Sequence, residues 1–156
     1  MKTHIIGMGS PLGDDQVGWR TLRALETVIQ STTVVFSQCH MPAAELLGLM
    51  RDGQRVILID GIHSGLPLGH IHCWRDQAVL QMQGSLSTHG VDVASLLALA
   101  AALQQLPPEI IVYGIEIDKN NCTPESHLSL AVEQAIPQLV HQIKAFIDPS
   151  DLRARS

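Results

Sequence analysis

The chain has 156 residues, 46% of them hydrophobic and 16% charged, so it can bury a sizeable core and does not have the composition of a disordered protein. A formal net charge of −5 and the lack of a basic stripe argue against a nucleic-acid partner. Its apolar runs are too short to span a membrane, and its amino terminus does not resemble a signal peptide. Its three cysteines (Cys39, Cys73, Cys122) are scattered, which argues against a disulfide framework and favours a cytoplasmic location.

Hydrophobic patterning predicts strands that alternate with helices along the chain. In order, we expect a strand at 3–8, a helix at 15–30, a strand at 32–37, a helix at 42–53, strands at 55–60 and 70–75, a helix at 91–106, and a strand at 109–117. A last helix, with Thr123 as its N-cap and Pro124 as its first residue, carries apolar residues from Leu128 to Ile147. Pro137 is expected to kink or split this helix.

The connection between the third and fourth strands decides the topology. Residues 61–69 are too few, and too rich in Gly and Pro, to form a crossover helix, so the fourth strand should run antiparallel to the third, at an edge. We therefore predict a single-domain α/β fold, a three-layer sandwich with a twisted, mostly parallel five-stranded sheet, one antiparallel strand and helices on both faces. The domain should cover 1–147, followed by a polar tail at 148–156.

Three polar side chains are predicted to meet beyond the carboxyl ends of the parallel strands, where such sheets bind ligands. Asp15 follows the first strand and Asp60 ends the third. His89 precedes the helix 91–106, which must start at the same edge if the next strand is parallel. Two carboxylates and an imidazole suit a first-row divalent metal such as nickel, zinc or iron. Each residue alone would more often be a helix cap or a turn residue, and their convergence is what favours a metal site.

Other interpretations fit the sequence less well. The Gly7–Gly13 stretch begins like a dinucleotide loop, but the third glycine position holds Leu12, and neither a P-loop lysine nor a nucleophile elbow is present. Cys39 and His40 could form a nucleophile pair, although adjacent residues on an extended chain point to opposite faces. His70 and His72 share one strand face and could be ligands, but exposed polar residues are common on edge strands.

Four motifs in order resemble those of the hydrogenase maturation proteases. The opening motif reads Gly7-Met8-Gly9-Ser10-Pro11-Leu12-Gly13-Asp14-Asp15, with Ser10 in place of the usual Asn. The others are "VILIDGIHSG" around Asp60, "STHGVDVASLLALA" around His89, and the late Gly114-Ile115-Glu116. The resemblance covers essentially the whole chain.

The resemblance implies an endopeptidase that removes the C-terminal extension of a nickel-loaded [NiFe] hydrogenase large-subunit precursor. Asp15, Asp60 and His89 would contact nickel supplied by the precursor, and Asp15 and Asp60 would be catalytic, as in an aspartic-type endopeptidase. Either a metal-activated water with a carboxylate as general base, or direct polarisation of the scissile carbonyl, would fit. The alternatives are a non-catalytic nickel-binding maturation or chaperone module and a nucleotide-binding enzyme. The oligomeric state is not predicted.

Overall fold

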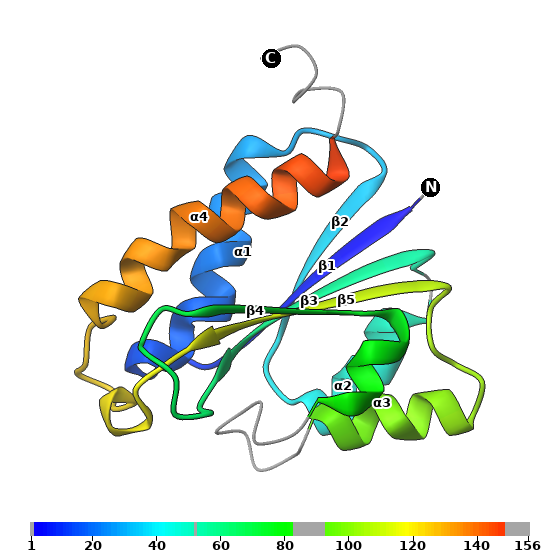
Figure 1. The fold of residues 1–156 in the computed structure, drawn as a ribbon. Coiled ribbons are helices and arrows are strands. Elements are labelled where there is room, and N and C mark those ends of the chain that lie inside the picture. Colours follow the sequence, from blue (N-terminus) through cyan, green and yellow to red (C-terminus); the bar gives the residue numbers. More distant parts are fainter. Residues whose placement is uncertain (1, 52, 83–92, 149–156) are drawn as a thin grey trace.

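The centre of the molecule is a five-stranded sheet of order β2-β1-β3-β5-β4, seen in a computed structural model that describes residues 2–51, 53–82 and 93–148 (Figure 1). The four strands of its parallel part are β1 (Thr3–Met8), β2 (Val34–Cys39), β3 (Arg55–Ile62) and β5 (Glu109–Glu116). The remaining strand, β4 (Ile71–Arg75), pairs antiparallel with β5 at the edge. The predicted fold class is confirmed, and β4 lies beside β5 and not beside β3, which precedes it.

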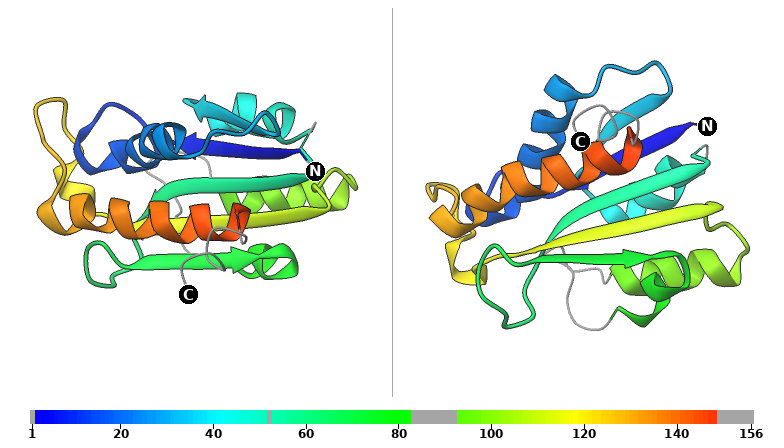
Figure 2. Two further views of the ribbon diagram at one scale, coloured as in Figure 1. Left: turned by 90° about the horizontal axis from the view of Figure 1, so that it is seen from above. Right: turned by 45° about the horizontal axis from the view of Figure 1, so that its top comes forward.

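Within the residues described, four α-helices enclose the sheet, two on each face (Figures 1 and 2). α1 (Val17–Val28) and α4 (Leu130–Ile147) cover one face, and α2 (Pro42–Met50) and α3 (Val93–Ala102) cover the other. Short 3₁₀ helices lie in the connections: η1 (Gly13–Gln16), η2 (Asp76–Gln81) and η3 (Lys119–Asn121). η2 falls between the predicted strand at 70–75 and the predicted helix at 91–106, where no element was expected.

The continuous apolar run of β3 is explained by burial on both faces. Ile57 and Ile59 pack in the cluster beneath α1 and α4, whereas Leu58 and Ile62 pack in the cluster beneath α2 and α3. Successive side chains of a strand point to opposite faces, so a strand covered on both sides has no position for a polar side chain without a special role. Asp60, fully buried within this run, is therefore an exception that needs a reason.

The last helix begins later than predicted, and of the kink or split expected at Pro137 the split is absent. It begins at Leu130 with Ser129 as N-cap, and not near Thr123, whose hydroxyl instead bonds the Ser126 hydroxyl in a local turn. It also runs through Pro137 without splitting. Buried side chains before and after the proline, Val132, Ala135, Leu139 and Ile143, anchor both halves to the same core, which offsets the lost backbone hydrogen bond.

The start of α1 is pressed against the backbone of two strands. A Cβ at Gly18 would lie 2.1 Å from the carbonyl oxygen of Met8 and 2.8 Å from that of Ile59. Only a residue without a side chain permits this approach. This close approach of α1 to the strands places η1, directly before α1, at the carboxyl ends of β1 and β3. η1 also contacts β3.

The predicted tail begins at Asp148, the C-cap of α4, and its residues 149–156 lie outside those described. Among the described residues, no helix combines the length and apolar character needed to cross a membrane.

We predict opposite effects for alanine at two helical glycines. Gly18→Ala should lower the free energy of unfolding by about 1–3 kcal/mol, because its methyl group would collide with strand backbone. Gly48→Ala in α2, where a Cβ would meet nothing within 4 Å, should raise it by up to about 1 kcal/mol. Urea unfolding of both variants measures the difference. Equal stability of the two variants would contradict the close contact at Gly18.

Candidate active site

The turn after β1 presents Asp15 as a buried carboxylate at the carboxyl edge of the sheet. Gly13 adopts a positive φ of 51°, and a Cβ there would lie 1.9 Å from the carbonyl oxygen of Asn121, so the turn requires glycine. Ser10 fixes the acid: its hydroxyl donates to Asp15 Oδ2 at 2.5 Å, and its N–H donates to the Asp15 carbonyl at 3.2 Å. The serine at position 10 therefore supplies a hydrogen-bond donor to the Asp15 carboxylate.

Asp60 lies at the same edge, on the neighbouring strand. It is fully buried, and its Oδ1 accepts a hydrogen bond from the Gly61 N–H at 2.8 Å. β3 continues two residues past Asp60, to Ile62, so the acid lies within the strand and does not end it as predicted. Its register partner on β5 is Gly114, where a Cβ would lie 3.1 Å from the side chain of Ile62 and 3.3 Å from that of Trp74. η1, which holds Asp15, contacts β3, which holds Asp60.

The third predicted residue, His89, lies outside the described residues. The premise behind its prediction is confirmed, because α3 leads into β5 and β5 is parallel to β3, so α3 begins at the carboxyl edge. Within 2–51, 53–82 and 93–148, no group of three or more His, Cys, Asp or Glu side chains is placed to hold a metal ion. A three-ligand site at this edge therefore depends on His89 and stays a prediction.

Asp14, adjacent to Asp15, has a different environment. Its carboxylate is fully buried and accepts four hydrogen bonds from the segment between β5 and α4. The donors are the Asp118 N–H at 3.0 Å, the Asn121 side-chain amide at 3.1 Å, and the N–H and hydroxyl of Ser129 at 2.6 and 2.7 Å. Asp14 thus fastens the turn of Asp15 to the N-cap of α4, which explains why that helix starts at this point.

We predict that Asp14→Asn destabilises the protein by about 2 kcal/mol or more, because an amide NH₂ would face donors that now bond a charged acceptor. Asp118→Asn is the matched control, since the Asp118 carboxylate accepts only a local bond, from the Asn120 N–H at 2.9 Å, among the hydrogen bonds of the described residues. Urea unfolding compares the two variants. Similar midpoints for both would show that the Asp14 contacts contribute little.

Cys39 does not form a nucleophile pair with His40. Its side chain is fully buried, and burial raises the pKa of its thiol to about 12, with the charges of Glu45 and Asp60 acting in the same direction. The His40 ring instead packs against the Trp19 ring, with centroids 4.6 Å apart. A thiol this difficult to ionise is a poor nucleophile at neutral pH.

The three thiols should therefore react in a fixed order. Alkylation with iodoacetamide at mildly alkaline pH should label exposed Cys73 first and buried Cys39 last, with partly buried Cys122 between them. Peptide mass spectrometry at increasing times gives the order, and denatured protein serves as the control in which all three should react. Early labelling of Cys39 would contradict its environment.

Two residues with close contacts near this edge were not predicted as functional. Glu116, at the end of β5, is fully buried and accepts hydrogen bonds from the N–H and hydroxyl of Ser64 and from His72 Nε2. Burial alone would raise the pKa of Glu116, but the Ser64 and His72 contacts outweigh it and hold the pKa below its ordinary value. His72 is thus partly buried and paired, whereas the sequence favoured an exposed edge residue. The sequence signal used for Asp60 was an acidic residue at the end of a continuous apolar run. The same signal is present at Glu116.

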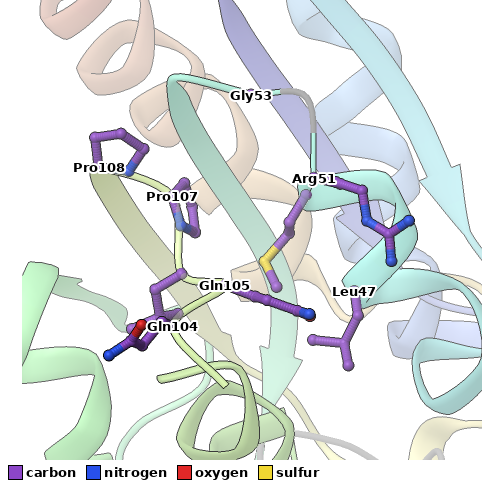
Figure 3. Close-up of a pocket in the computed structure, with 9 residues that line it drawn as sticks. Leu47, Arg51, Gly53, Gln104, Gln105, Pro107 and Pro108 are labelled. Carbon is purple, nitrogen blue, oxygen red and sulfur yellow. The ribbon is translucent and has the colours of Figure 1, made fainter. Parts of the chain in front are cut away.

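A separate hollow of about 280 Å³ lies at the opposite, amino edge of the sheet (Figure 3). It lies between the ends of α2 and α3, and its described lining includes no carboxylate, imidazole or thiol. The lining residues are Leu47, Met50, Arg51, Gly53, Gln104, Gln105, Leu106, Pro107 and Pro108. The hollow therefore has none of the groups on which the candidate site depends.

The sequence matches the hydrogenase maturation protease family model (HycI) over residues 41–145, which is more than half of the chain. The chain belongs to the hydrogenase maturation protease family. The matched region contains Asp60 and His89 and begins after Asp15. The resemblance inferred from the motifs is confirmed, and the chain is homologous to endopeptidases of this family.

Solved structures agree in fold over nearly the whole chain. The maturating endopeptidase HybD of E. coli has a TM-score of 0.79 at 24% identity, covering 96% of this chain and 94% of that one. An endopeptidase from E. coli has a TM-score of 0.81 at 25% identity with the same coverage, and the [NiFe] hydrogenase maturation protease HybD from Thermococcus kodakarensis has 0.74 at 20%, covering 94% and 99%. No curated protein matches the sequence significantly.

Proposed function

We propose that this protein is an endopeptidase that removes the C-terminal extension of a nickel-loaded [NiFe] hydrogenase large-subunit precursor. The observation that carries the proposal is that two buried carboxylates, Asp15 and Asp60, lie on contacting elements at the carboxyl edge of the sheet, in a chain of this family. In the proposed reaction nickel belongs to the substrate: the precursor brings it to the site, and it marks a precursor ready for cutting. A cytoplasmic location would match that of such a substrate.

The donors suit this role. Two carboxylate oxygens together with the imidazole predicted from His89 form a mixed oxygen and nitrogen set, which borderline metals such as nickel accept. Such a set has few ligands, so it would hold the ion firmly only when the precursor supplies further ones. Bound in this way, the metal would supply Lewis-acid chemistry at the scissile peptide.

The residues of the chain would supply position and a base. Ser10 orients the Asp15 carboxylate and the Gly61 N–H orients that of Asp60, so neither needs to reorganise when substrate arrives. A carboxylate next to the scissile bond can take a proton from the attacking water and pass it to the leaving amine. Asp60 lies within β3 and Asp15 in the short 3₁₀ helix that follows β1, so both are held by the sheet, which favours a defined distance between base and peptide.

The second candidate is a nickel-binding module that uses the same residues without cutting. It would leave the precursor at full length, and this outcome distinguishes it from the protease. A nucleotide-binding enzyme is less well supported, because the turn after β1 directs Asp14 and Asp15 inward where a phosphate would need positive or neutral donors. A titration with NAD(P)H or ATP that shows saturable binding would revive that candidate.

The decisive experiment incubates purified protein with nickel-loaded and with nickel-free precursor and measures intact masses. We predict a single cut in the nickel-loaded precursor only. Asp15→Ala, Asp60→Ala and His89→Ala should each reduce its rate by roughly a hundredfold or more, because each removes a ligand or the base.

The adjacent acids provide an internal control for that series. Asp14→Asn should lose stability and cut more slowly but still measurably at low temperature, because it loosens the turn of Asp15 and leaves the Asp15 carboxylate in place, whereas Asp15→Ala should stay folded and lose cutting. An Asp15, Asp60 or His89 variant that cuts at the normal rate would remove that residue from the site.

A further inference from the structure

The connection between β3 and β4, residues 63–70, is tied at both ends to one residue, Glu116. At the start of the connection, the N–H of Ser64 donates to Glu116 Oε2 at 3.2 Å and the Ser64 hydroxyl donates to Oε1. At its end, the Gly69 N–H donates to the Glu116 carbonyl and the Glu116 N–H donates to the His70 carbonyl, both at 2.9 Å. Side chain and backbone of Glu116 thus close the connection into a loop of fixed shape.

A third contact holds the Glu116 carboxylate itself. His72 Nε2 lies 3.0 Å from Glu116 Oε1, and the His72 ring is stacked on the Trp74 ring with a 2° angle between their planes and 5.2 Å between centroids. The Glu116 side chain is 1% exposed and that of His72 15% exposed, so these contacts are largely shielded from water. Shielding strengthens hydrogen bonds to a charged group.

This loop follows the strand of Asp60 and lies on the same edge of the sheet. Asp60 is in register with Gly114, and Glu116 is two residues further along β5, so Asp60 and Glu116 point to the same face. Two leucines of the loop are exposed although they are large and apolar: Leu66 at 45% and Leu68 at 40%. An apolar loop of fixed shape beside a buried acid is suited to contact a peptide that approaches that acid.

We propose that Glu116 is a positioning residue of the candidate active site, whose carboxylate fixes the loop 63–70 as a rigid wall that places the substrate peptide against Asp60. This inference rests on the proposed function, because it assumes a peptide that is cut at this edge. Glu116 touches neither metal nor peptide in this role. It acts through Ser64 and the loop.

The test substitutes Glu116→Gln, which keeps the size of the side chain and removes the charge that three donors share. Glu109→Gln is the matched control: it makes the same change at the first residue of the same strand, at the opposite edge of the sheet. Hydrogen exchange, followed by mass spectrometry, should show at least roughly tenfold faster exchange in peptides covering 63–70 in Glu116→Gln and no change in Glu109→Gln.

Processing of nickel-loaded precursor should fall by roughly ten- to a hundredfold in kcat/KM, mostly in kcat, because a displaced peptide still binds but is poorly aligned. Two further variants guard against misfolding of Glu116→Gln. Ser64→Ala removes only the hydroxyl contact, and His72→Phe keeps the ring stacked on Trp74 but removes its N–H. Each should give a smaller change in the same direction.

The proposal is overturned if Glu116→Gln cuts at the wild-type kcat/KM, or if exchange in 63–70 is unchanged in all three variants. A wild-type protein that leaves every precursor intact would instead refute the proposed function. The exchange result would still decide whether Glu116 fixes the loop.

Discussion

The carboxylate of Asp14 accepts four hydrogen bonds from the segment between β5 and α4, and these bonds join parts of the chain that are more than a hundred residues apart. On one side they fix the turn that carries Asp15. On the other they satisfy the N–H and hydroxyl of Ser129, at the first turn of α4. The close approach of Gly18 to the carbonyl of Ile59 completes the attachment of this turn to the sheet. The candidate site therefore depends on a neighbouring acid that has no chemical part in it.

The two adjacent aspartates have different tasks because the turn between β1 and α1 directs them to different partners. Asp14 faces backbone and side-chain donors of a distant segment, whereas the Asp15 carboxylate accepts a hydrogen bond from the hydroxyl of nearby Ser10. Neither task follows from residue type. The difference between the two acids depends on the path of the chain just before them, which includes the positive φ at Gly13.

Patterns local in sequence predicted much of the fold. β1 was predicted with its observed bounds, because an apolar run ended by glycine is a purely local signal. The edge position of β4 followed from a connection too short for a helix, and the common edge of Asp15 and Asp60 followed from parallel topology. These predictions needed no knowledge of which distant residues touch.

Features that depend on long-range hydrogen bonds were missed. Thr123 and Pro124 look like a helix start, but Ser129 is the N-cap, since Asp14 bonds it there. The pairing of β4 with β5, and the capture of His72 by Glu116, likewise require knowing the strand order. His89 lies outside the described residues, so the third member of the predicted site has support from topology alone.

The buried thiol of Cys39 has a consequence for an enzyme that must release its product. Cysteine binds soft and borderline metals tightly, but only as the thiolate. With its side chain fully buried and a pKa of about 12, Cys39 stays protonated at neutral pH in this structure. In a protein that acts as proposed, the site would thus present oxygen and nitrogen donors to the nickel while its own sulfur stays inert. The ion would leave with the precursor's ligands after the cut, and the protease would be free for another round.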